Sequence, residues 1–66
     1  MGQRPFSVTF VFPTMIDAKE FVYRSTLVFD VPCYRDGPRV TVIMHHDQHE
    51  LVVEIAEKHH GEAVVT

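Results

Sequence analysis

The chain has 66 residues, with a single cysteine, no tryptophan and no asparagine. One cysteine excludes an internal disulfide, which is a common way to stabilise a domain whose core is this small. Secreted domains of this length tend to carry several cysteines, so the composition predicts a reducing compartment, the cytoplasm. The remaining routes to stability are a well-packed core, a bound metal ion or association with a second chain.

Long apolar runs and an excess of positive charge are missing as well. The longest apolar stretches have the length of a strand, so neither a secretory signal nor a membrane span is expected. The formal net charge is −3 at pH 7, which predicts no attraction to nucleic acid or to anionic lipid. Apolar residues make up 45% and charged residues 23%. This is the composition of a globular protein, and the length predicts one domain over residues 1–66.

The apolar pattern predicts four strands. Residues 6–12 alternate apolar and small polar side chains, and residues 39–45 are rich in β-branched side chains. Shorter strands are expected at 26–31 and 62–66. Residues 32–38 are expected to form a loop, because two prolines and an Asp-Gly pair fit poorly inside a hydrogen-bonded ladder.

Two helices are expected, over residues 14–24 and 48–60. Thr14 and Asp47 are each followed three residues later by an acidic residue, which is the spacing of a capping pair at a helix N-terminus. Gly61 suits the left-handed position that often follows a helix.

The resulting order, β-α-β-β-α-β, is that of the ferredoxin-like α+β fold, with a four-stranded antiparallel sheet and two helices on one face. The strands at 6–12 and 39–45 should lie in the middle of the sheet, and we expect them to pair in parallel. The predicted core consists of the apolar residues on the inward faces: Phe6, Val8, Phe10, Phe12, Ala18, Val22, Leu27, Phe29, Val40, Val42, Met44, Leu51, Val52 and Ile55.

The other face of such a sheet has no helix over it. Strict alternation places small β-branched residues there, with Asp30 as the only charged one. A face of this kind favours self-association, most simply as a twofold homodimer. The predicted interface consists of Thr9, Val11, Val28, Thr41 and Ile43.

All five histidines lie between positions 45 and 60. His45, His46 and His49 fall at a predicted corner between a strand and a helix. The positive end of that helix favours the neutral imidazole, which is the form that binds a metal ion. These three residues are therefore candidate ligands for a divalent metal. His59 and His60 end the second helix, and a capping role explains them.

Cys33 and Arg39 have the Cys-x5-Arg spacing of tyrosine-phosphatase phosphate loops. That chemistry requires a ring of backbone N–H groups with a helix N-terminus behind it. Pro38 removes one N–H group, and the segment leads into a strand. The spacing therefore does not predict a phosphatase.

Three functions agree with these features. The first is a small non-enzymatic interaction or regulatory module that acts as a homo-oligomer or with a protein partner. The second is a metal-binding protein that uses the corner of His45, His46 and His49. The third is a small-ligand sensor of ACT type, although the segment 12–14 lacks the glycines expected in its ligand loop. No catalytic residue is predicted, and no cofactor apart from the possible divalent metal.

Overall fold

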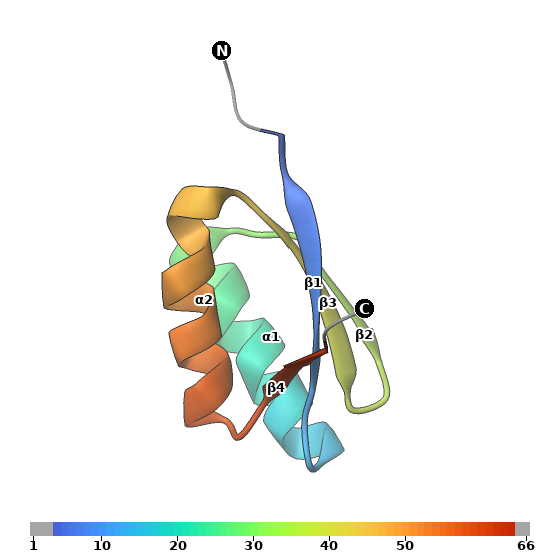
Figure 1. The fold of residues 1–66 in the computed structure, drawn as a ribbon. Helices are drawn as coiled ribbons and strands as arrows, with labels where there is room; N and C mark the ends of the chain where they lie inside the picture. The colour runs from blue at the N-terminus through green and yellow to red at the C-terminus, as the bar shows by residue number, and fades with distance from the viewer. Residues whose placement is uncertain (1–3, 65–66) are drawn as a thin grey trace.

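The computed structural model describes residues 4–64. Its strands form one sheet in the order β2-β3-β1-β4 with antiparallel neighbours, and both helices cover the same face (Figure 1). This confirms the predicted ferredoxin-like α+β fold. Residues 65–66, predicted to end the fourth strand, lie outside the described range. The elements are β1 (Phe6–Val11), α1 (Met15–Phe29), β2 (Cys33–Asp36), β3 (Arg39–Met44), α2 (His46–Lys58) and β4 (Glu62–Val64).

The two central strands pair antiparallel, with Phe6 opposite Met44 and Phe10 opposite Val40. The expected parallel pairing is therefore wrong. Helix α1 carries the chain back to the start of the sheet, so that β2 runs in the same direction as β1. The tight turn at Gly37, whose φ is 63°, then reverses the chain, and β3 runs against both neighbours.

Helix α1 continues to Phe29 and includes most of the segment 26–31, which was predicted to be a strand. The Thr26 hydroxyl donates to the Val22 carbonyl at 2.8 Å, and the backbone carbonyl of Thr26 accepts the backbone N–H of Asp30 at 3.1 Å. The prediction failed because strand propensity depends on context, whereas an established helix propagates readily until something stops it. Here the stop is Asp30, in the left-handed conformation at φ 52°.

The second strand, β2, lies inside the segment 32–38 that was predicted to be a loop. It is an edge strand that pairs with β3 alone. Pro32 precedes its first paired residue and Pro38 lies in the turn beyond it, so neither proline has to donate a ladder hydrogen bond. Prolines at both ends therefore bound this strand without breaking it.

Helix α2 begins two residues earlier than predicted, at His46. His45 is the N-cap residue, and its backbone N–H donates to the Gln48 side-chain oxygen at 3.1 Å. The predicted cap at Asp47 is therefore wrong. Asp47 lies in the first turn, where its negative charge is stabilised by the positive end of the helix.

Three phenylalanine rings form the centre of the core. The Phe21 ring on α1 packs at a tilt against the rings of Phe10 and Phe12, with ring centroids 5.4 and 4.9 Å apart. Leu27 and Leu51 were predicted to be buried but are 67% and 49% exposed, so these two assignments are wrong. Other predicted core residues are partly buried against the centre, namely Phe6, Val8, Val22, Phe29 and Ile55. The fully buried ones are Phe10, Phe12, Ala18, Val40, Val42, Met44 and Val52.

The sheet face away from the helices is more polar than expected. The strand registers align Tyr34, Thr41, Thr9 and Val64 in one row across the sheet. The two threonine hydroxyls in this row lie 3.0 Å apart and are hydrogen-bonded. The adjacent row contains Asp36, Arg39, Val11 and Glu62. Asp30, expected to be the only charge on this face, instead ends α1.

Candidate functional site

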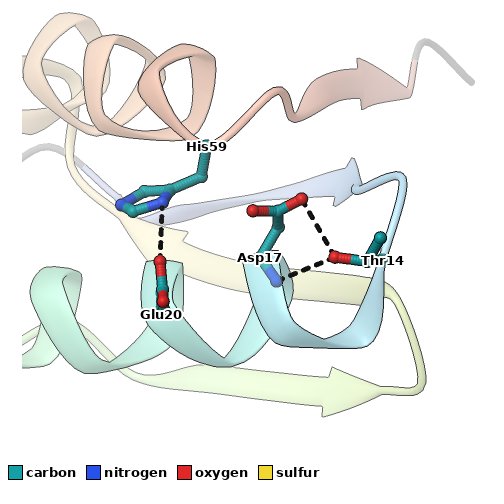
Figure 2. Close-up of polar contacts among 4 residues, drawn as sticks. All are labelled: Thr14, Asp17, Glu20 and His59. Carbon is teal, nitrogen blue, oxygen red and sulfur yellow. Dashed lines mark hydrogen bonds and ion pairs between the residues drawn. The ribbon is translucent and has the colours of Figure 1, made fainter.

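The first turn of α1 is held by the predicted cap. Thr14 is the N-cap residue, and its hydroxyl oxygen accepts the backbone N–H of Asp17 at 3.2 Å. The same hydroxyl donates to the Asp17 carboxylate at 3.0 Å. These two hydrogen bonds fix the side chain of Asp17 on the helix surface, one turn before Glu20 (Figure 2).

His59 reaches this surface from the end of α2. It is the C-cap residue of that helix, and its backbone N–H donates to the Ala56 carbonyl. Its Nδ1 atom lies 3.5 Å from a carboxylate oxygen of Glu20 (Figure 2). The His59 side chain is 13% exposed and that of Glu20 is 59% exposed. The contact therefore connects α1 and α2 at the molecular surface and becomes an ion pair when His59 is protonated.

Asp17, Glu20 and His59 each offer one ligand atom, and these atoms all lie within 4.8 Å of one another. One imidazole nitrogen and two carboxylate oxygens form a donor set that Zn²⁺ accepts, and water is the usual fourth ligand of a zinc ion held by three protein groups. The sequence predicted only a capping role for His59. Asp17 and His59 are 42 positions apart, and only the packing of α2 on α1 brings them together.

The three histidines predicted to bind a metal lie around the start of α2 and are exposed. The His46 ring lies 4.7 Å from the Phe6 ring, and the His49 ring lies 5.6 Å from it. His45 precedes the helix as its N-cap residue. Within residues 4–64, these histidines are not among the side-chain groups close enough to share one ion. Metal binding by them stays a prediction.

The outward face of α1 carries an apolar stripe, which we call the α1 stripe, formed by Ile16, Tyr23 and Leu27. These residues are 69%, 67% and 67% exposed. At 3.6 residues per turn, their spacing places them within about 40° of one another on the helix. The buried residues Ala18 and Phe21 lie on the opposite side of the helix. This stripe was not expected from the sequence, because the predicted helix ended at residue 24.

An open groove of about 400 Å³ lies beside the α1 stripe, between α1 and α2. Its walls combine apolar and basic side chains. Val28, 63% exposed, lies in this groove. The groove is lined by Arg24, Val28, Ile55, Lys58 and His59.

The predicted interface residues are divided between two surfaces. Thr9 and Val11 on β1, with Thr41 and Ile43 on β3, occupy the outer face of the sheet and are half-buried by their neighbours. Val28 lies on α1, so its predicted place on the sheet face is wrong. Among residues 4–64, the three most exposed large apolar side chains belong to α1, and Tyr34 on β2 is 63% exposed.

Cys33 begins β2 and is half-buried. Burial raises the pKa of its thiol above the usual range, and a hydrogen bond with Thr26 opposes this shift in part. A thiol with a raised pKa is a poor nucleophile at neutral pH. Arg39 lies across the hairpin, opposite Asp36, so the Cys-x5-Arg segment folds as two paired strands and not as a phosphate cradle.

No family model, curated protein or solved structure matches this chain. Within residues 4–64, neither helix has the length and apolar character that crossing a membrane requires. The functional proposal therefore rests on the exposed side chains described above.

Proposed function

We propose that this protein is a small non-enzymatic interaction module that associates with a second copy of itself through the α1 stripe. The observation that carries the proposal is the exposure of Ile16, Tyr23 and Leu27 on one narrow face of a single helix. Large apolar side chains exposed together on one helix face are typical of a protein interaction site. A short chain without an internal disulfide also gains stability when it buries such a surface.

The α1 stripe is a better candidate than the outer face of the sheet. A partner on the sheet would have to cover the charged row that contains Asp36, Arg39 and Glu62. Burying such charges without good partners costs free energy. Lys19 and Arg24 flank the stripe, and Glu20 lies at its edge between Ile16 and Tyr23. Long side chains of this kind can keep their charges near water while their stems pack.

Replacing Leu27 by glutamate should weaken self-association at least about 100-fold. Burying a leucine contributes about 1.5–3 kcal/mol, and a symmetric dimer contains this side chain twice. Sedimentation velocity between about 1 µM and 1 mM measures the effect for the unmodified chain and for L27E. Because α1 is already exposed at this position, circular dichroism should show the same helix content for both proteins.

The matched control is the double variant Val11→Lys and Ile43→Lys on the outer face of the sheet. We expect it to associate as strongly as the unmodified chain. A loss of the dimer in this variant, with L27E unaffected, would move the interface to the sheet. An unmodified chain that stays monomeric up to about 1 mM would refute self-association.

A second candidate function is the binding of a divalent cation. The close approach of Asp17, Glu20 and His59 supports these ligands over the corner of His45, His46 and His49. All three ligands already have structural partners, since the Asp17 carboxylate accepts the hydroxyl of the N-cap residue Thr14, and Glu20 and His59 contact each other. A cation would therefore have to replace these contacts with metal bonds.

Isothermal titration of the protein with Zn²⁺ tests the second function. If Asp17, Glu20 and His59 bind the ion, we expect one Zn²⁺ per chain and at least tenfold weaker binding in H59A, since each ligand contributes substantially to affinity. The double variant His45→Ala and His49→Ala should bind as the unmodified chain does. The reverse pattern would assign the ion to the histidine corner, and no binding heat in any variant would exclude the function.

The third candidate, an ACT-type sensor of a small ligand, has less support. A shallow pocket of about 290 Å³ follows β1 and is lined in part by Phe12 and Pro13, but this segment has no glycine to let a ligand approach the backbone.

The single cysteine supports a reducing compartment, the cytoplasm, as the place where the protein works.

A further inference from the structure

From the charges around the α1 stripe, we infer that two copies of α1 pack antiparallel about a twofold axis, with Ile16 of each copy against Leu27 of the other. This inference rests on the proposed self-association and adds its geometry. Along α1, Ile16, Glu20, Tyr23 and Leu27 are separated by four, three and four residues. This is the spacing with which one helix presents a continuous seam to another.

In an antiparallel pair of helices, the seam of one copy packs against the same seam of the other copy. Positions 16 and 27 lie equally far from the middle of the stripe, as do positions 20 and 23. A twofold axis through that middle therefore places Ile16 opposite Leu27 of the second copy at both ends. In the centre, Glu20 faces Tyr23, whose ring is apolar and whose hydroxyl can donate to a carboxylate. The apolar side chains at the two ends thus meet each other, and the carboxylate in the centre meets a hydrogen-bond donor.

The charges distinguish the two possible directions. Glu20 and Arg24 lie on the same side of the stripe, and the twofold axis brings this side of one helix against the same side of the other. In the antiparallel pair, Glu20 of one copy therefore lies beside Arg24 of the other. Symmetry forms this pair of opposite charges twice. A parallel pair would instead bring the two Glu20 side chains together and would place Lys19 near Arg24. Charge complementarity therefore selects the antiparallel arrangement.

The side chains on the seam are free to make these contacts. Glu20 is 59% exposed, and its contact with His59 uses one carboxylate oxygen at 3.5 Å. Ile16, Tyr23 and Leu27 are each about two-thirds exposed. Helix α1 has 15 residues and is therefore about 22 Å long. A single pair of helices of this length forms a small interface, so the dimer should dissociate in the micromolar range and not be permanent.

Cysteine cross-linking tests the direction of the helices. Two proteins are prepared on a Cys33→Ser background, one with Ile16→Cys and an affinity tag, the other with Leu27→Cys and no tag. After mixing and mild oxidation, we expect the disulfide between tagged and untagged chains to exceed both disulfides between identical chains by about tenfold, because only facing positions come within disulfide reach. Both changed positions are exposed, and circular dichroism checks that each variant folds.

The outcomes separate the inference from the proposed function. Disulfides mainly between identical chains would overturn the antiparallel arrangement and keep self-association through the α1 stripe. If the unmodified chain sediments as a dimer but the cysteine variants do not cross-link, the contact lies elsewhere and the inference is overturned. An unmodified chain that sediments only as a monomer would refute both.

A charge exchange provides the second measurement. Arg24→Glu alone should raise the dissociation constant of the dimer by about tenfold, since it replaces two attractive pairs with two repulsive ones. Adding Glu20→Arg to the same chain restores opposite charges across the axis and should bring the constant back to within about threefold. Additive losses from the two substitutions would contradict the inferred contact.

Discussion

Replacing Phe21 with alanine should leave a large fraction of the protein unfolded at 25 °C. Phe21 is completely buried on α1, and its ring contacts those of Phe10 and Phe12. Truncating a buried phenylalanine costs about 3–5 kcal/mol through lost burial and the cavity that remains. A domain of this length has a total stability of only about 3–10 kcal/mol. Urea unfolding followed by circular dichroism measures the change.

The matched control for this prediction is Tyr23→Ala on the same helix. Tyr23 is 67% exposed, so its truncation should change the stability of the monomer by about 0.5 kcal/mol or less. Both proteins are compared at low micromolar concentration, where self-association adds little to the apparent stability. Equal losses from F21A and Y23A would contradict the described orientation of α1.

Replacing Gly61 with alanine should destabilise the fold by about 1–3 kcal/mol, as overpacking of a core does. Gly61 is buried beside the ring of Phe12. A Cβ atom at position 61 would lie 2.4 Å from Cε2 of that ring and 2.8 Å from its Cζ. Phe12 is 2% exposed and packed against Phe21, so the ring cannot move away without disturbing the core. Thermal or urea unfolding measures the loss.

A double-mutant cycle identifies the cause of this loss. In a chain that already carries Phe12→Leu, the smaller side chain leaves room for a methyl group, and Gly61→Ala should cost less than it does alone. Gly37→Ala is the comparison for a pure backbone effect, because its Cβ would meet nothing within 4 Å although φ is 63°. Its cost should be the same in both backgrounds. Additive effects of the changes at 12 and 61 would rule out the steric explanation.

The position of Gly61 also shows how local and tertiary requirements differ. The sequence analysis assigned Gly61 to the left-handed turn after α2. In the structure that conformation belongs to His60, with φ 65°, and Gly61 is required by the approach of Phe12. A glycine that provides a left-handed turn and a glycine that makes room for a side chain look the same in the sequence after a helix. Only the packing of the segment after α2 against Phe12 distinguishes them.

Local patterns were sufficient where one interaction dominates. The alternation of residues 6–12 and the β-branched run from 39 to 44 led directly to the two central strands, because one side of each strand packs in or against the core. The Thr14–Asp17 spacing located the start of α1, because that cap needs only neighbouring atoms. The ferredoxin-like order was predicted from these elements together with the helix and strand expected after residue 45 and a second strand that was placed at the wrong residues.

Tertiary structure decided the rest. Residues 26–29 have the composition of a strand but continue α1 as far as Asp30, and Phe29 at the end of this segment packs against the core. This extension alone creates the α1 stripe, since Leu27 completes it. The approach of His59 to Asp17 and Glu20 depends on how two helices far apart in sequence pack together. The sequence by itself thus determined the order of the elements and the buried face of the central strands. The α1 stripe and the group of Asp17, Glu20 and His59 arise instead from the length of α1 and from the packing of the two helices, because these depend on contacts between distant residues.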